Sequence, residues 1–181
     1  MNYAAIKWAD VANGPGVRVS LFVSGCTHRC PGCFNQEAQD FGYGRPFTDV
    51  EEEQILDALG FQPLRGLSLL GGEPLEPENQ RALLPFLRRV KEKCPQKEIW
   101  CYSGYTLEEL WGDSRARCES TGEMLSLIDI LVDGPFVEEK KDLNLRFRGS
   151  SNQRILNVPA SLEARAPVLW DGDMTIRPIV P

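Results

Sequence analysis

The sequence has little of what marks nucleic-acid-binding, membrane or secreted proteins. Its 20 Lys and Arg residues are outnumbered by 26 Asp and Glu, for a net charge of -6. This balance argues against the clustered basic surface that binds nucleic acid. No apolar run is long enough to span a bilayer, and residues 1–8 lack the pattern of a signal peptide. We therefore expect a cytoplasmic protein that binds neither nucleic acid nor membrane.

Histidine is also scarce, because His28 is the only one in the chain. We interpret it as a solvated loop residue. Three of the six cysteines, Cys94, Cys101 and Cys118, do not form a second CxxC-type cluster. A buried cysteine commonly acts as a small hydrophobic residue, so we predict no ligand role for these three.

The length and composition are those of a one-core protein. With 181 residues and 42% hydrophobic content, the chain can form a single domain. Strands are predicted over 1–10, 17–23, 66–70, 98–102 and 129–134, and helices over 49–59, 77–93, 106–111 and 117–127. Strands that alternate with helices favour an α/β fold with a parallel sheet.

Two of the predicted helices carry local signals. Thr48 and Glu51 have the spacing of a capping box at the start of the first helix. The buried face of that helix is predicted to consist of Val50, Ile55, Leu56 and Leu59. Pro85 lies inside the second helix and is expected to kink or divide it.

The C-terminal residues 159–181 are predicted to be an extension of the domain formed by residues 1–158. Residues 168–176 contain an Asp171-Gly172 turn between short apolar stretches, which indicates a β-hairpin. We expect this hairpin to cover an open edge of the sheet.

The segment Gly25–Asn35 contains three cysteines, Cys26, Cys30 and Cys33, within eight residues at CxxxCxxC spacing. Iron–sulfur clusters are held by cysteine thiolates, usually four. Three would leave one iron of a 4Fe-4S cluster open, and an open metal position is typical of catalytic sites. Two alternatives remain: a zinc site that recruits His28, and a disulfide that leaves one thiol over.

CxxxCxxC after a strand resembles the signature of the radical S-adenosylmethionine superfamily. The runs 13–18, 22–26 and 30–35 are similar to those of the glycyl-radical-enzyme activases. The resemblance implies one 4Fe-4S cluster with an open iron on Cys26, Cys30 and Cys33, and S-adenosylmethionine as a cofactor. The chain is too short for an eight-unit barrel of about 250 residues. We therefore expect a truncated partial (β/α) barrel of the radical SAM type, open on one side.

The resemblance also assigns the residues that would contact S-adenosylmethionine. Gly71, Gly72 and Glu73 end a predicted strand; glycines permit close backbone approach, and a carboxylate can accept hydrogen bonds from the ammonium group. A simple turn is the competing interpretation of this motif. The other expected contacts are Gly32, Cys33 and Phe34 in the cysteine loop and the hydroxyl of Ser103.

The segments 133–136 and 147–154 resemble those of the activases whose partner is the large chain of an anaerobic ribonucleotide reductase. The resemblance implies that the chain generates a glycyl radical in the C-terminal region of that partner. Asp133, Arg148 and Asn152 are expected to contact the partner or the substrate. Reduced flavodoxin or a similar protein is the expected electron donor.

Three other functions remain open at this point. An activase of the pyruvate formate-lyase type, or a radical SAM enzyme acting on a small molecule, would share the cofactor and differ in substrate. An electron-transfer iron–sulfur protein would not be an enzyme.

Overall fold

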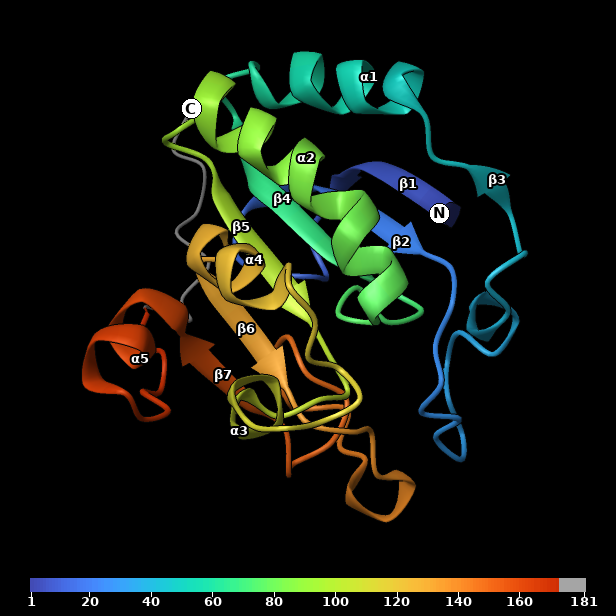
Figure 1. Cartoon of the computed structure of the whole chain (residues 1–181), viewed down its shortest axis with the longest axis vertical. Helices are drawn as coiled ribbons and strands as arrows, with labels where there is room; N and C mark the ends of the chain where they lie inside the picture. The colour runs from blue at the N-terminus through green and yellow to red at the C-terminus, as the bar shows by residue number, and fades with distance from the viewer. Residues whose placement is uncertain (173–181) are drawn as a thin grey trace.

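A computed structural model describes residues 1–172. In this part of the chain a seven-stranded open sheet has the order β3-β1-β2-β4-β5-β6-β7 (Figure 1). The strands are β1 (Asn2–Asp10), β2 (Val17–Val23), β3 (Arg45–Pro46), β4 (Leu64–Gly71), β5 (Glu98–Tyr102), β6 (Ile130–Asp133) and β7 (Arg154–Asn157). The four central strands β2, β4, β5 and β6 are parallel, whereas β1, β3 and β7 pair antiparallel. The predicted α/β class is confirmed.

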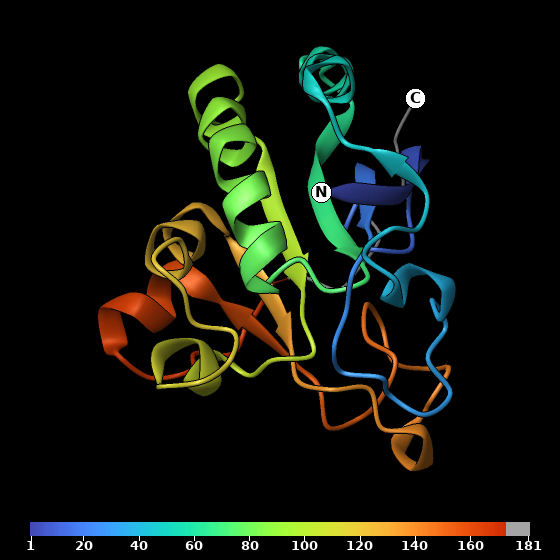
Figure 2. The same cartoon turned by 45° about the vertical axis from the view of Figure 1, so that its right-hand side comes forward.

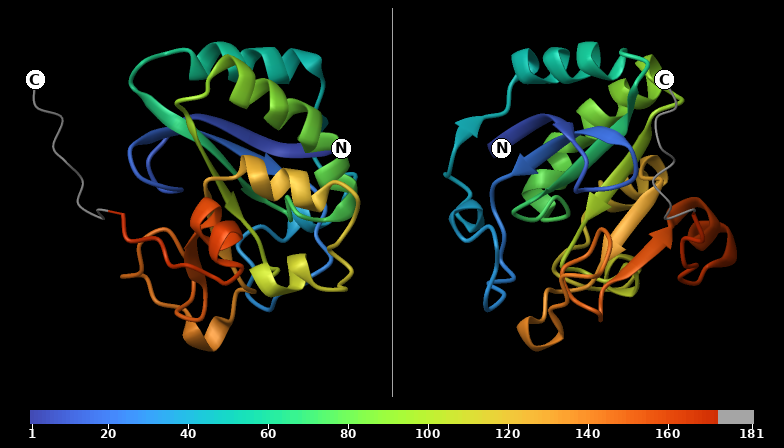
Figure 3. Two further views of the ribbon diagram at one scale, coloured as in Figure 1. Left: turned by 60° about the vertical axis from the view of Figure 1, so that its left-hand side comes forward. Right: turned by 180° about the vertical axis from the view of Figure 1, so that it is seen from behind.

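The helices described are α1 (Asp49–Leu59), α2 (Pro77–Lys93), α3 (Leu107–Trp111), α4 (Thr121–Leu127) and α5 (Val158–Ala164), with 3-10 turns η1 (Glu37–Gln39) and η2 (Glu138–Lys140). Helices α2 and α4 lie in front of the sheet in Figure 1, and the strands lie in front of α2 when the molecule is seen from behind (Figure 3, right). Helix α1 packs into the same hydrophobic core through Ile55, Leu56 and Leu59. None of the helices in residues 1–172 is long and apolar enough to cross a bilayer.

The two faces of the sheet bury different side chains because successive strand residues point to opposite sides. On the helix-covered face, Leu21, Leu69 and Leu131 belong to the main hydrophobic core. On the other face, Trp100 and Val132 belong to a smaller cluster. The main core therefore lies between the sheet and its helices.

Helix α1 begins as predicted, with the capping box of Thr48 and Glu51. Ile55 and Leu56 are buried as expected, but the prediction for Val50 was wrong, since it is 61% exposed. At 100° per residue, Val50 lies on the side of the helix opposite the buried stripe.

Helix α2 is continuous through Pro85, so the proline does not divide it. Pro85 lies on the exposed side of the helix. The carbonyl of Arg81, which loses its intrahelical partner there, can therefore bind water instead.

The end of the chain differs from the predicted extension. Residues Val158–Ala164 form helix α5, and the predicted hairpin over 168–176 lies partly outside the described residues. In its described part, Val168 and Trp170 exchange backbone hydrogen bonds with Asn157 and Ile155 of β7. This short extended segment lies along the outer edge of β7; the rest of the predicted hairpin, residues 173–176, falls outside the described residues.

Arg18 is fully buried in the face of the sheet that the helices leave uncovered. Its guanidinium donates to Ser68 Oγ at 2.8 Å and to the carbonyl of Glu98 at 2.9 Å. Burial lowers the pKa of Arg18 to about 10. A Cβ on Gly14 would lie 2.9 Å from the Arg18 side chain, so part of the 13–18 motif serves to pack this buried cation.

The parallel strands all end at the same rim of the sheet (Figure 2). The loop after β2 contains the cysteines, the loop after β4 contains Glu73, and the loop after β5 contains Ser103. Ligands of open α/β sheets bind at this carboxyl end of the strands. The topology therefore brings the predicted site residues of three separate loops together.

Candidate metal and cofactor site

A cavity of about 370 Å³ lies at this rim. The predicted site residues that line it are Cys26, Cys30, Cys33, Phe34, Gly71, Gly72, Glu73, Ser103 and Arg148. Gly32, Asp133 and Asn152 are not among the lining residues. Most residues that were selected from the sequence therefore surround one space.

The cysteine loop has the backbone shape that its glycines permit. Gly25 has φ of +96° and Gly32 has φ of +67°, values that side chains other than glycine rarely adopt. A Cβ on Gly25 would also lie 2.2 Å from the Phe41 ring. Asn35 donates its backbone N–H to Cys33 Sγ at 3.4 Å. Hydrogen bonds to ligand sulfur are one way in which a protein sets the reduction potential of an iron–sulfur cluster.

The thiols lie in a partly desolvated environment. Burial raises the pKa of Cys26 to about 11, and the nearby carboxylates of Glu73 and Glu76 add to the effect. Burial also raises the pKa of Cys30. Free thiols at these positions are protonated at neutral pH, so metal binding must release their protons, as it does at other thiolate sites.

The spacing of the thiols bears on which metal they can hold. Within residues 1–172, no three His, Cys, Asp or Glu side chains converge closely enough to bind a single metal ion. A tetrahedral zinc needs all its ligand atoms about 2.0–2.3 Å from one centre. A 4Fe-4S cluster distributes its cysteines over several irons, so its thiols can lie farther apart. Three thiols of one short loop that line one cavity fit such a cluster.

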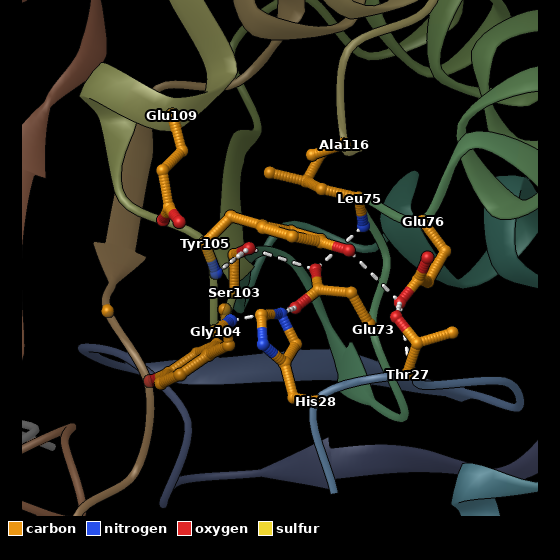
Figure 4. Close-up of polar contacts among 12 residues, drawn as sticks. Thr27, His28, Glu73, Leu75, Glu76, Ser103, Gly104, Tyr105, Glu109 and Ala116 are labelled. Atoms are coloured by element: carbon orange, nitrogen blue, oxygen red, sulfur yellow. Dashed lines mark hydrogen bonds and ion pairs between the residues drawn. The ribbon is translucent and has the colours of Figure 1, made fainter. Parts of the chain in front are cut away.

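Glu73 is 1% exposed, and both of its carboxylate oxygens are occupied (Figure 4). Oε1 accepts hydrogen bonds from Leu75 N at 2.8 Å and Ser103 Oγ at 2.9 Å. Oε2 accepts from Gly104 N at 2.7 Å and lies 3.2 Å from His28 Nε2. Glu73 therefore connects the loop after β4 to the loop after β5.

The prediction that His28 is solvated was wrong. Its side chain is only 12% exposed, lines the cavity, and packs against the Tyr105 ring, with centroids 4.2 Å apart and the ring planes tilted by 58°. Its Nε2 is within ion-pair distance of Glu73, yet the imidazole is not oriented for a hydrogen bond. Spacing within the cysteine motif gave no sign of this contact, which depends on the packing of three loops.

The glycines of the Gly-Gly-Glu-Pro motif are also required for close backbone packing, which the sequence did not predict. A Cβ on Gly71 would lie 2.7 Å from the carbonyl oxygen of Val23, and one on Gly72 would lie 2.6 Å from that of Gly25. Both glycines therefore let the end of β4 approach the backbone that leads into the cysteine loop.

Gly104 provides a test of this packing. A Cβ there would lie 2.7 Å from the His28 ring, so Gly104→Ala is expected to destabilise the protein by about 1–3 kcal/mol through overpacking. Urea unfolding measures the loss. Gly122→Ala is the matched control, because a Cβ on Gly122 has no neighbour within 4 Å and should not destabilise. Combining Gly104→Ala with His28→Ala should restore the stability that Gly104→Ala loses. If stability is not restored, the His28 ring is not the group with which the added Cβ collides.

Of the three residues expected to contact the partner or substrate, Asp133 is the last residue of β6, and Arg148 and Asn152 lie in the loop between β6 and β7. Asp133 is fully buried, and its carboxylate binds the Arg154 guanidinium and Leu107 N. Arg148 donates to the carbonyl of Gln153 at 2.6 Å. Asn152 donates to the carbonyl of Pro135 at 2.8 Å. Each of these side chains therefore has an internal partner.

Sequence reasoning missed two polar side chains that hold the site. Asn79 of α2 is fully buried and donates to the carbonyls of Ser24 and Glu73. Glu76 is 5% exposed and contacts the cysteine loop. Their nearness to the Gly-Gly-Glu-Pro motif was the available signal, but polar residues at a helix start are usually exposed or capping.

Comparison with known protein families shows the class to which this chain belongs. A family model described as a 4Fe-4S single cluster domain matches residues 12–156. The fold and the cysteine loop thus define an iron–sulfur cluster protein of the α/β class.

Three curated relatives carry the name anaerobic ribonucleoside-triphosphate reductase-activating protein. The one from Haemophilus influenzae is 48% identical over 157 residues, which cover 86% of this chain and 97% of the relative. The one from Escherichia coli K12 is 44% identical, over 84% and 96% of the two chains. The one from Enterobacteria phage T4 is 36% identical, over 86% and 93%. The chain belongs to the family of anaerobic ribonucleoside-triphosphate reductase-activating proteins.

Proposed function

We propose that this protein activates an anaerobic (class III) ribonucleoside-triphosphate reductase by generating a glycyl radical on its large chain. The observation that carries the proposal is that the three thiols of the cysteine loop and the buried Glu73 line one cavity. The names of the relatives favour this partner over a pyruvate formate-lyase and over an electron-transfer role.

In this proposal Cys26, Cys30 and Cys33 hold one 4Fe-4S cluster with an open iron. When bound, the reduced cluster supplies the electron that cleaves S-adenosylmethionine to methionine and a 5′-deoxyadenosyl radical, which removes a hydrogen atom from a glycine of the partner. The Asn35 N–H, directed at Cys33 Sγ, stabilises the negatively charged sulfur.

We further propose that S-adenosylmethionine binds along Gly71, Gly72 and Glu73, with Ser103 and the cysteine-loop residues Gly32, Cys33 and Phe34 beside it. The carboxylate of Glu73 has about four acceptor positions, and three of them accept hydrogen bonds, from Leu75 N, Ser103 Oγ and Gly104 N. The imidazole of His28 lies beside the remaining position, but it is not oriented to donate a hydrogen bond to Glu73. An ammonium group can therefore bind Glu73 by taking the place of His28.

The glycine-bearing C-terminal region of the partner would approach from the mouth of the cavity. Phe34 lies there, 66% exposed, with its ring 5.4 Å from that of Phe136. Asp133, Arg148 and Asn152 are proposed to contact the partner or to shape the loops that do. We also propose that the open sheet is a truncated radical SAM barrel formed by residues 1–158, that the protein is cytoplasmic, and that reduced flavodoxin or a similar protein donates the electron.

An anaerobic assay tests this function. The chain is reconstituted with iron and sulfide, reduced with dithionite, and given S-adenosylmethionine. We expect methionine and 5′-deoxyadenosine in equal amounts, and a glycyl radical detected by electron paramagnetic resonance once the large reductase chain is added. An intact cluster that yields neither product, even with the reductase present, would contradict the proposal.

A further inference from the structure

Glu76 is a buried carboxylate that the proposed chemistry does not use. Three donors converge on its Oε1: Thr27 N at 2.8 Å, Thr27 Oγ1 at 2.5 Å and Tyr105 Oη at 3.2 Å (Figure 4). Burial raises the pKa of Tyr105 to about 12, so its hydroxyl is protonated and can donate. Glu76 thus joins the cysteine loop to the loop after β5.

The helix that follows does not explain why a carboxylate is buried here. Glu76 is the N-cap residue of α2, yet its side chain makes no capping hydrogen bond. The threonines that cap α1 and α3, Thr48 and Thr106, both form capping boxes. Burying a charge is costly unless it is hydrogen-bonded, and the partners of Glu76 lie outside its own helix.

Apart from the packing of His28 against Tyr105 and Glu73, the segment from Thr27 to Cys33 has few attachments to the rest of the chain. Among the described residues, the segment from Thr27 to Cys33 makes one internal backbone–backbone hydrogen bond, from Cys33 N to Cys30 O. Thr27 is itself exposed, so apolar packing does not fix it. Because Thr27 directly follows Cys26, its attachment to Glu76 restrains the first of the three thiols.

We propose that Glu76 is a positioning residue. It holds the cysteine loop in place by accepting hydrogen bonds from Thr27, and Tyr105 donates a further hydrogen bond to the same carboxylate oxygen. The inference rests on the proposed function, because it presumes a cluster on the three cysteines. The two carboxylates of the loop after β4 then have different tasks. Glu73 faces the cofactor, and Glu76 faces the loop that binds the cluster.

Release of iron from the reconstituted, cluster-loaded protein to a ferrous chelator reports on the loop without any assay of activity. Hydrogen bonds to a charged group are strong, so losing all three should raise the equilibrium constant for opening of the cysteine loop at least tenfold. We therefore expect Glu76→Ala to release iron roughly tenfold or more faster than wild type. Glu76→Gln, whose amide oxygen can still accept two of the three bonds, should restore part of the retention.

The matched control is Glu78→Ala, which removes an exposed carboxylate from the same helix. It should release iron at the wild-type rate. Should Glu76→Ala fail to fold, Thr27→Val and Tyr105→Phe each remove one donor and are expected to speed release by roughly two- to tenfold. In cluster-loaded protein, equal rates for Glu76→Ala and Glu78→Ala, or unchanged rates in both donor variants, would overturn the inference.

The same experiment separates this inference from the proposed function. A wild-type chain that assembles no 4Fe-4S cluster would overturn the proposed function, and with it the role of Glu76. A wild-type chain that holds its cluster, with no effect of any variant at Glu76, Thr27 or Tyr105, would overturn the positioning role alone.

Discussion

Cys30→Ala is expected to abolish both the cluster and the cleavage of S-adenosylmethionine. Each of the three thiols lines the cavity, and the cysteine loop contains no fourth cysteine to replace a lost ligand. Two thiolates cannot retain a cluster that is normally held by at least three, so the iron content should fall to background. Iron and sulfide analysis after anaerobic reconstitution measures the first effect, and 5′-deoxyadenosine formation measures the second.

Cys118→Ala is the control for this prediction. Cys118 is half-buried, and its thiol contacts Gln80 Oε1 at 3.5 Å. It should therefore keep full iron content and activity. Retention of a 4Fe-4S cluster by the Cys30 variant would show that another group binds the iron, and the assignment of the three ligands would have to be abandoned.

Glu73→Gln is expected to weaken the binding of S-adenosylmethionine while leaving the iron content unchanged. An amide offers no negative charge to the ammonium group, and its NH2 would face backbone donors such as Leu75 N or Gly104 N. Loss of a charge-assisted hydrogen bond costs about 1.5–3 kcal/mol. The affinity should therefore fall by roughly ten- to a hundredfold, as measured by anaerobic equilibrium dialysis of cluster-loaded protein.

Two further variants sharpen the interpretation. Glu73→Asp keeps the charge but shortens the side chain, so it should bind S-adenosylmethionine more tightly than Glu73→Gln does, but less tightly than wild type. Glu78→Gln removes an exposed charge nearby and should bind like wild type. If Glu73→Gln bound S-adenosylmethionine as tightly as wild type, the ammonium group would have to bind elsewhere, and the buried carboxylate would serve only to hold Ser103 and Gly104.

The elements that could be predicted were those with strong local signals. Strand β2 has an alternating β-branched pattern, and α1 has a capping box. Both were placed with their observed bounds. Strand β7 was missed although the equally short β6 was predicted, because β7 has only two apolar residues between Arg154 and Asn157, whereas β6 begins with a run of three. Val50 was assigned to the core from its type, whereas its angular position on the helix places it in solvent.

Glycine positions show the same division. Gly25 and Gly32 were recognisable as parts of a tight loop, and their left-handed backbone agrees with this. The sequence could not show why residue 104 must be glycine, because its missing Cβ makes room for His28, which lies 76 residues earlier in the chain. A contact between two loops after different strands leaves no trace in the sequence around either one.

The sequence by itself determined which reactive groups the site contains. Three cysteines at CxxxCxxC spacing and the Gly-Gly-Glu-Pro motif supply three thiols and a carboxylate, because residue type and local spacing are properties of short segments. Only the tertiary structure decided how these groups are held. The parallel strands bring His28, Glu76 and Tyr105 into contact from three loops, and the burial that results gives Glu73 and Glu76 their separate hydrogen-bond partners.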